Sequence, residues 1–329
     1  MKKTGYIAAM LLSLLLLTAC GEEDSLYGRG ISSTVENGAV TALRLQTEEG
    51  EREVQLSMET GIISLSREKD GRSLLMQRPE QLQLFVQGKD SKEGFLADTI
   101  TIESALAQQP VLLKDGTSLE LWEGPYWQKN YKLDGQTIFL EDRPGGIFLP
   151  EDMEQALAAK LSARYDKLGR AYDLPKLLEN AYSEWKSAPD KYGQPRKVIQ
   201  ETALAAQSEE VVYVQTYLEL RSSMGAEQLR MGEAFRKSSG EPVGAAELFS
   251  CSMDRLLDVL FEQNGIEEAT AAELKAAFRP ELLVFYPDAL EIYWPAGSMT
   301  GQDSAFVLGA DIEDLEGLIQ PWAVPMKDK

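Results

Sequence analysis

Apolar and polar residues alternate in short runs from residue 40 to about residue 148, and turn residues separate the runs. An alternation with a period of two is typical of strands that bury one face. Asp115-Gly116 and Asp134-Gly135 lie between runs rich in aliphatic and aromatic residues, and Asp-Gly is a strong signal for a tight hairpin. The pattern predicts an antiparallel β domain over residues 39–149, with its clearest runs at 43–45, 54–56, 62–65, 82–86 and 100–102.

The apolar period changes at Pro150 from two residues to the three- and four-residue spacing of a helix, and proline suits a first helical turn. We expect an α+β fold class: an N-terminal antiparallel β domain, then an α+β domain over residues 150–329 with an antiparallel sheet and packed helices. A capping box, Thr270-Ala271-Ala272-Glu273, opens the last helix. The predicted helices cover 150–168, 174–185, 251–263 and 271–278, and the predicted strands cover 198–206, 211–220, 229–235, 282–285, 290–294 and 305–308.

The first 20 residues have the pattern of an export signal. Lys2 and Lys3 precede an apolar run over 6–17, which is too short to span about 30 Å of hydrocarbon as a stable helix. Leu17-Thr18-Ala19-Cys20 is similar to the lipobox of bacterial lipoproteins, in which a signal peptidase cuts before a cysteine that carries a diacylglyceryl group. We expect residues 1–19 to be a signal peptide and Cys20 to be lipidated. An ordinary secretory signal followed by an incidental cysteine is the alternative.

A lipidated Cys20 with a further acyl chain such as palmitate provides the two anchors that lasting membrane attachment requires. Residues 20–38 contain glycines, serines and acidic side chains with only scattered apolar residues, so we interpret them as a flexible tether. The expected location is the cell membrane, with the protein lipid-anchored on its extracytoplasmic side.

The composition excludes several classes of partner, catalytic site and metal site. The 329 residues include 33 Lys and Arg, 53 Asp and Glu and no histidine, a formal charge of −20 that becomes −22 once Lys2 and Lys3 are removed. A surface of this sign repels nucleic acid. Without imidazole, neither a Ser-His-Asp or Cys-His nucleophile nor a His-ligated zinc can form. The sequence also lacks a phosphate loop, a Cys-x-x-Cys pair and a calcium loop, so we expect no metal and no cofactor.

Cys251 is the only cysteine besides Cys20. No disulfide can therefore form within the mature domain, and the fold must depend on its apolar core. Cys251 lies between apolar residues at the start of a helical pattern, where a buried small side chain is the simpler interpretation than a reactive thiol.

Two short stretches carry a family resemblance. Residues 235–243, Phe-Arg-Lys-Ser-Ser-Gly-Glu-Pro-Val, lead to Glu247-Leu248-Phe249, and residues 284–295 read Val-Phe-Tyr-Pro-Asp-Ala-Leu-Glu-Ile-Tyr-Trp-Pro. These resemble a strand, turn and helix entry and a strand pair in a domain of unknown function. That domain occurs in the extracytoplasmic half of the lysozyme-responsive anti-sigma factor and in the non-catalytic region of a peptidoglycan deacetylase. The resemblance covers residues 150–320 and implies a binding role at the cell envelope.

The chain also departs from this family. Gly225-Ala226-Glu227 stands where members often have Gly-Ala-His. An anti-sigma factor needs a cytoplasmic domain, but only Lys2 and Lys3 precede the apolar run. The deacetylase needs histidine ligands for its metal, and this sequence has no histidine. The resemblance therefore implies the fold and a binding role, not either activity.

Residues 122–131 contain four aromatic side chains in a turn-rich stretch. Aromatic faces next to carboxylates suit stacking on a sugar ring or a protein contact. Packing of the same rings inside a hairpin core is the simpler interpretation. The candidate ligand-binding residues are Trp122, Tyr126, Trp127 and Tyr131.

No catalytic residue is predicted. The acidic pairs 151–152, 209–210 and 267–268 are adjacent in sequence, so their side chains diverge and cannot form a two-carboxylate site. We expect a non-enzymatic binding or sensing protein that captures a cationic envelope or secreted protein such as lysozyme. The alternatives are an envelope enzyme that uses carboxylates only and a structural envelope subunit.

Overall fold

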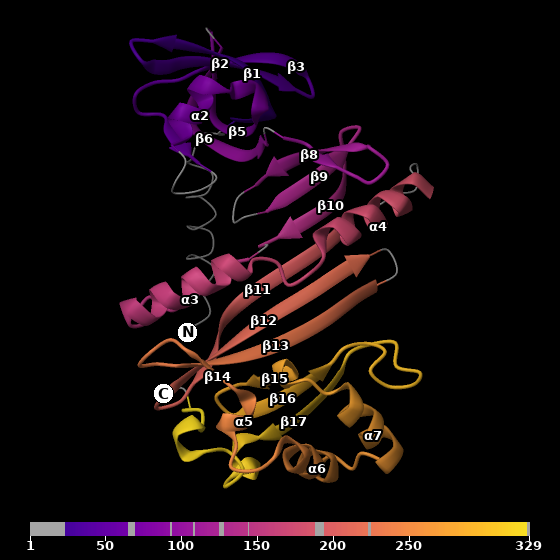
Figure 1. Ribbon diagram of the computed structural model, residues 1–329. Coiled ribbons are helices and arrows are strands. Elements are labelled where there is room, and N and C mark those ends of the chain that lie inside the picture. Colours follow the sequence, from indigo (N-terminus) through magenta and orange to yellow (C-terminus); the bar gives the residue numbers. More distant parts are fainter. Residues whose placement is uncertain are drawn as a thin grey trace, which may run out of the picture. The chain divides into compact units, whose positions relative to one another are not determined.

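The computed structural model describes residues 24–64, 70–92, 94–107, 109–124, 128–143, 145–187, 194–222 and 225–327. The fold is α+β, as the sequence predicts, with mainly antiparallel sheets and several helices (Figure 1). The chain forms two compact units. The barrel unit contains the described residues up to Val111 together with 120–124, and the sheet unit contains Leu112–Leu119 and the described residues from 128 onward.

The barrel unit is a closed ring of five strands. β1 pairs with both β2 and β5, β3 pairs with β2 and runs parallel to β6, and β5 and β6 complete the ring. A five-stranded barrel of this connectivity, with a helix between its third and fourth strands, is the architecture of OB-folds. The elements are β1 (Asp24–Glu36), β2 (Ala39–Thr47), β3 (Gly50–Gln55), β4 (Gly61–Ile63), α2 (Gly71–Gln77), η1 (Pro79–Gln81), β5 (Leu82–Ser91) and β6 (Gly94–Leu106).

Alternate residues of these strands fill the barrel. Leu45, Val54, Leu84 and Ile100 are completely buried, and α2 contributes Leu75 to the same apolar cluster. Asp70 begins α2 by accepting hydrogen bonds from two backbone N–H groups of the first turn. The barrel therefore has its own core.

The prediction of a flexible tether is wrong for residues 24–36, which form β1. Gly28 and Gly30 suggested flexibility, but they allow close backbone approach: a Cβ at Gly28 would lie 2.6 Å from the carbonyl oxygen of Gln46, and one at Gly30 would lie 2.1 Å from that of Pro79. Asn37 and Gly38, both with positive φ, make the turn from β1 to β2. The signal peptide and Cys20 lie outside the described residues.

The sheet unit is built on a long, mostly antiparallel sheet that runs from β9 to β14. β10 and β11 are parallel because α3 and α4 connect them, and these helices lie across one face of the sheet (Figure 1). Leu157, Leu161 and Tyr165 of α3 pack there on β12 and β13. Its elements are β9 (Lys129–Leu133), β10 (Gln136–Asp142), α3 (Gln155–Leu168), α4 (Leu174–Ser187), β11 (Arg196–Gln207), β12 (Val211–Ser222), β13 (Gly225–Arg236) and β14 (Pro242–Val243), while β7 (Val111–Leu112) and β8 (Ser118–Glu123) are divided between the two units.

The predicted boundary between residues 149 and 150 differs from the division in the structure, because β9 and β10 belong to the sheet unit. An alternating pattern identifies a strand without showing which sheet it joins. Both Asp-Gly hairpins are present. Asp134 and Gly135 have positive φ between β9 and β10, and the Leu113 N–H donates to the Thr117 carbonyl around Asp115-Gly116.

A C-terminal layer, residues 245–327, packs against β12 and β13. The ring of Phe285 stacks on Tyr213 with centroids 4.4 Å apart, and Trp294 is completely buried with its indole N–H donating to the Leu274 carbonyl over 3.0 Å. Its elements are α5 (Ala245–Leu248), α6 (Met253–Gln263), α7 (Glu268–Ala277), η4 (Pro280–Leu282), β15 (Leu283–Phe285), β16 (Ala289–Trp294), β17 (Phe306–Asp311), η5 (Ile312–Leu315) and η6 (Pro321–Ala323).

The predicted helices and strands of residues 150–329 are present with shifts at their ends, and the largest is that of α3, which begins at Gln155, five residues after the predicted start. α7 begins three residues before its predicted start, and Glu273 accepts hydrogen bonds from Thr300 instead of closing a capping box. None of the helices in the described part of the chain is long and apolar enough to cross a membrane.

Candidate functional site

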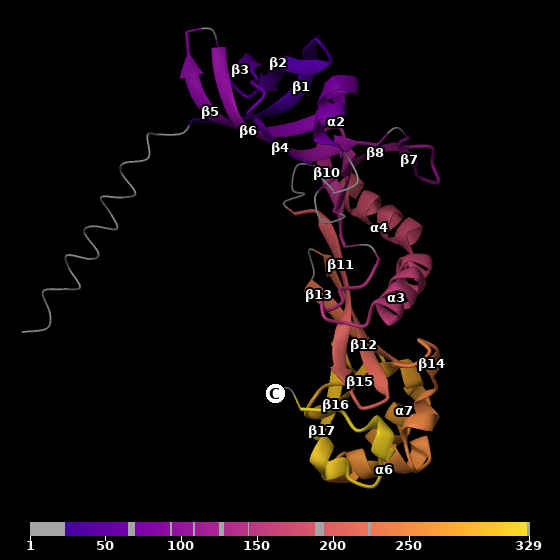
Figure 2. The same cartoon turned by 90° about the vertical axis from the view of Figure 1, so that its left-hand side faces the viewer.

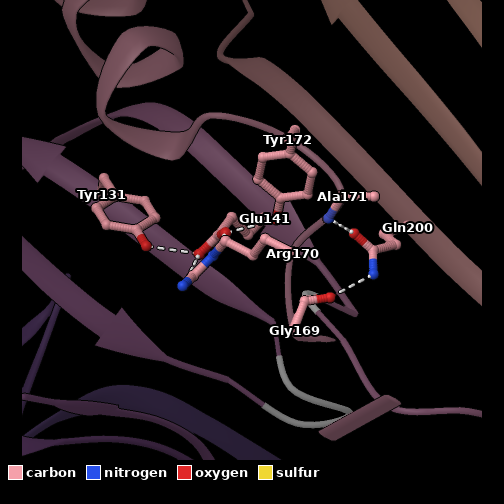
Figure 3. Close-up of polar contacts among 7 residues, drawn as sticks. All are labelled: Tyr131, Glu141, Gly169, Arg170, Ala171, Tyr172 and Gln200. Carbon is pink, nitrogen blue, oxygen red and sulfur yellow. Dashed lines mark hydrogen bonds and ion pairs between the residues drawn. The ribbon is translucent and has the colours of Figure 1, made fainter. Parts of the chain in front are cut away.

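A fully buried carboxylate, Glu141 on β10, lies beneath the connection between α3 and α4 (Figure 3). Its Oε1 accepts from the Tyr172 hydroxyl and from Nε of Arg170, each over 2.5 Å. Its Oε2 accepts from the Tyr131 hydroxyl over 2.5 Å and from Nη2 of Arg170 over 3.0 Å. Four donors thus satisfy the two oxygens of one buried charge.

The backbone around this carboxylate is fixed by a second buried polar residue. Gly169 ends α3 with positive φ, and Gln200 of β11 holds the turn from both sides (Figure 3). Its side-chain amide donates to the Gly169 carbonyl over 2.9 Å and accepts from the Ala171 N–H over 2.7 Å. Arg170 and Tyr172 are therefore held over the sheet by residues on either side of them.

The environment keeps Glu141 ionised. Desolvation is the largest single influence and would raise its pKa, but the hydrogen bonds from Arg170, Tyr131 and Tyr172 and the charge of Arg170 together hold the pKa below its usual value. Burial, followed by the charge of Glu141, raises the pKa of both tyrosines. A carboxylate that is ionised and fully hydrogen-bonded has no free position for a substrate proton, so this network stabilises the architecture.

A cleft of about 580 Å³ adjoins the network, and Tyr172 contributes to its wall. α4 covers the β10 side of the sheet, where Trp185 donates to Gln136 over 3.0 Å, and the start of β13 remains exposed. Phe139, Leu177 and Leu220 give the cleft an apolar floor. A volume in this range suits a small ligand.

Most of the cations around the cleft already have partners. Arg196 donates from Nε to Glu184 over 2.7 Å, Arg221 donates to Glu219 over 2.5 Å, and Lys197 lies 3.1 Å from Asp142. The acidic residues around it include Asp173, which accepts from the Lys176 N–H in the first turn of α4 over 3.1 Å. The charged groups of the cleft are therefore largely used within the protein.

The negative charge of the sheet unit is unevenly distributed. Residues 245–327 contain 15 Asp and Glu against 4 Lys and Arg, a net charge of −11. Residues 128–236, which we call the sheet layer, contain 17 acidic and 15 basic side chains. A hollow of about 570 Å³ in the C-terminal layer is lined by Glu291, Asp311 and Asp314. Among the described residues, no group of three or more acidic or cysteine side chains is arranged to hold a metal ion.

The structure describes two of the four predicted aromatic residues, Trp122 and Tyr131. Trp122 and Tyr131 are 4% and 1% exposed, so neither ring presents a face to a ligand, and packing within the core accounts for them. The indole N–H of Trp122 donates to Glu120 over 3.0 Å. Tyr126 and Trp127 lie outside the described residues, and their stacking role stays a prediction.

No sequence motif marks the buried network. Glu141 precedes Asp142 at the end of an ordinary alternating strand, and Arg170 lies 29 residues away in a connection between helices. Cys251 is half-buried and is the single cysteine of the described residues, compatible with the expectation of no disulfide.

No family profile and no curated protein matches the sequence. A DUF3298 family protein from Pseudomonas aeruginosa PAO1 is similar in structure over 57% of this chain and 88% of its own, with 12% identity and a TM-score of 0.34. A member of the same family from Bacteroides fragilis covers 66% of this chain and 92% of its own, with 8% identity and a TM-score of 0.35. At these scores the function has to be argued from this chain's own residues.

Proposed function

We propose that this protein is an extracytoplasmic lipoprotein, held at the cell membrane by Cys20, that binds a cationic envelope or secreted protein such as lysozyme without catalysis. The observation that carries the proposal is the net charge of −11 on residues 245–327, next to a sheet layer that is almost neutral. A one-sided charge attracts a partner of opposite sign and orients it during encounter.

The acids of the C-terminal layer have few partners of their own. Its ion pairs in the described part of the chain join Lys275 to Asp258, Arg279 to Glu281, Lys327 to Glu313 and Arg236 of β13 to Glu247, all on the surface. The remaining acids greatly outnumber the cations, and Asp311 and Asp314 are exposed around the hollow of this layer. A surface with so much uncompensated charge is complementary to a basic protein.

The alternative of an enzyme that uses carboxylates only has less support. It requires two separated acids that converge in a cleft, one of them able to exchange a proton. Glu141 is saturated by four donors, and Asp173 begins α4. The alternative of a structural envelope subunit is distinguished by the binding test, because such a subunit would bind its partner with an affinity that does not depend on charge.

The test is a titration of the chain from Gly21 onward with lysozyme by calorimetry, at about 50 mM and about 300 mM NaCl. Because exposed charges are screened over a Debye length of about 8–10 Å near physiological salt, we expect the affinity to fall about tenfold or more between the two conditions. Binding that is insensitive to salt would point to the structural role. No binding of lysozyme or other basic envelope proteins would overturn the proposal.

A matched pair of variants tests the position of the contact. D311N/D314N/E316Q removes three exposed charges from the C-terminal layer, and E151Q/D152N/D166N removes three from the sheet layer. At about 0.5 kcal/mol for each exposed charge, we expect the first variant to bind about tenfold more weakly and the second to bind within about twofold of the parent. Equal losses in both variants would contradict a contact on the C-terminal layer.

The anchor is tested separately by metabolic labelling with palmitate. We expect the label to enter the parent protein and to be lost from Cys20→Ala. Label that survives this substitution would contradict the lipidation site and would leave the binding proposal unaffected.

A further inference from the structure

The outer surface of the barrel unit carries an ordered array of side chains over β1, β5 and β6, which lie side by side (Figure 2). Leu84 and Val86 of β5 point into the barrel and are completely buried, so Phe85 between them points outward. Tyr27 of β1 is paired with Phe85, and Thr101 of β6 is paired with Phe85 on the other side.

The rows on either side of the two rings are polar. Gln87 lies opposite Ser25 on β1 and Thr99 on β6, two residues along from Phe85. Gln83 lies opposite Arg29, two residues along in the other direction. Gln83 and Gln87 lie diagonal to Tyr27, at the separation of about 7–8 Å between neighbouring strands that long side chains can bridge, and Thr101 lies directly opposite Phe85.

Tyr27 is accessible although its surroundings are ordered, and Phe85 beside it is half-buried. Tyr27 is 55% exposed, the largest exposed fraction among the aromatic residues that the structure describes. Partial burial and the nearby charge of Glu103 raise its pKa, and a hydrogen bond with Gln83 acts in the opposite direction. The ring is thus fixed within the array while its outer face remains open to solvent.

The chemistry of this face suits a sugar chain. A pyranose ring offers a C–H face that packs on an aromatic ring and equatorial hydroxyl groups that exchange hydrogen bonds with amides, hydroxyls and carboxylates. Arg29 and Glu103 give the array one charge of each sign, so an uncharged ligand complements it. Barrels of this architecture bind oligonucleotides or oligosaccharides on the face of their second and third strands, which correspond to β2 and β3 and not to this array.

Charge decides between these two classes of ligand. The described residues of the barrel unit contain 14 Asp and Glu against 7 Lys and Arg. A polyanion would meet a net charge of −7 there, with no counterion release to drive its binding. An uncharged glycan meets no such barrier.

The surface over β2 and β3 differs from this array. Its exposed side chains are Arg44, Gln46, Glu51 and Glu53, and Arg44 forms an ion pair with Glu51. Neither strand contains an aromatic residue. The aromatic platform is therefore specific to the β1–β5–β6 side.

We infer that the β1–β5–β6 surface of the barrel unit is a binding site for an uncharged glycan chain, with Tyr27 and Phe85 as the stacking platform and Gln83 and Gln87 as hydrogen-bonding groups. This site is separate from the acidic C-terminal layer and does not depend on the proposal made for it.

The test uses the full mature chain and a soluble N-acetylglucosamine hexamer, titrated by calorimetry. Removing an aromatic ring that stacks on a nucleic-acid base costs about 1–3 kcal/mol; with the lower part of this range for a sugar ring, we expect Phe85→Ala to weaken binding about tenfold. Tyr27→Phe keeps the ring and should bind within about threefold of the parent. Phe148→Ala, at a ring that is 42% exposed in the sheet unit, should bind like the parent.

Gln87→Ala protects the test against loss of folding, since it removes a polar group without altering the barrel core. We expect it to weaken hexamer binding several-fold with an unchanged circular dichroism spectrum. Failure of the parent to bind the hexamer, or equal binding by the parent, Phe85→Ala and Gln87→Ala, would overturn the assignment. Tighter binding of a single-stranded oligothymidylate than of the hexamer would also overturn it, in favour of nucleic acid.

Discussion

The sheet layer and the C-terminal layer belong to one compact unit but use charged side chains in opposite ways. In the sheet layer, acidic and basic residues occur in nearly equal number and many pair within the protein, as in Glu141 with Arg170 and Glu233 with Arg164. In the C-terminal layer the core is apolar and aromatic around Trp294, and the acids lie outside it with few partners. The same residue types therefore serve as internal architecture in one layer and as an external surface in the other.

This difference follows from what each layer has to stabilise. The connection between α3 and α4 contains backbone polar groups that need buried partners, and Gln200 supplies them, while Glu141 binds the side chains of Arg170 and Tyr172. In the C-terminal layer, helices and a small sheet satisfy their own backbone, so the interior can be filled by Leu, Phe and Trp side chains. Its charges remain available for association.

The largest effect on stability should come from the apolar core of the C-terminal layer. Trp294→Ala removes a completely buried ring and its hydrogen bond to Leu274, and we expect the free energy of unfolding of the sheet unit to fall by about 4 kcal/mol. Urea denaturation followed by far-UV circular dichroism measures this change. A loss below about 1 kcal/mol would show that the layer is not held by its core.

Breaking the internal ion pair of the sheet layer should have the second largest effect on the free energy of unfolding. Arg170→Ala leaves Glu141 buried without its cation, and we expect a loss of about 3 kcal/mol, toward the lower end for buried pairs because Arg170 is 32% exposed. Arg279→Ala removes the surface partner of Glu281 and serves as the matched control, with an expected loss below about 0.5 kcal/mol. Equal losses of stability in Arg170→Ala and Arg279→Ala would show that the ion pairs of the two layers contribute alike to stability.

The pH dependence of stability sharpens the same distinction. The pKa of Glu141 is lowered in the folded protein, so its contribution is present above the unfolded value of about 4.3 and is lost as the pH falls through the folded value. Below about pH 4.5, the free energy of unfolding of Glu141→Gln should therefore fall less steeply with falling pH than that of the parent. The difference in slope corresponds to the uptake of up to one proton on unfolding. Parallel pH profiles of parent and variant would contradict the assignment of an ionised Glu141.

The smallest effect on stability should come from the acidic surface. D311N/D314N/E316Q removes exposed like charges, and reduced self-repulsion should leave the free energy of unfolding within about 0.5 kcal/mol of the parent or slightly above it. Thermal unfolding at low and high salt measures this, and the difference should shrink as salt rises. A clear loss of stability would mean that these acids serve the fold.

The sequence predicts much of the sheet unit because its elements are long and strongly periodic. α4 and the strands β11 and β12 lie within two residues of their predicted ends. The prediction of β1 failed although Asn37-Gly38, a hairpin signal, was present, because Gly28 and Gly30 suggested flexibility in a strand where they permit close packing. Local composition does not distinguish these two roles of glycine.

The buried network could not be predicted for a different reason. Glu141, Arg170 and Gln200 come from two strands and a connection between helices, and the shortest separation among them in sequence is 29 residues. Nothing in the neighbourhood of any of these residues marks it as buried or paired. Only the three-dimensional arrangement of β10, β11 and the α3–α4 connection brings them together.

The path of the chain through β8 has a consequence for splitting the protein. The chain leaves the barrel unit after Val111, returns for residues 120–124 and belongs to the sheet unit again from residue 128. A single cut in the exposed Asp115-Gly116 turn would place β6 on one fragment and Trp122 on the other, although Leu106 of β6 pairs with Trp122 and that ring is buried within the barrel unit. The two fragments should therefore remain associated after cleavage, so this turn is a natural position for a split reporter that reassembles without a linker.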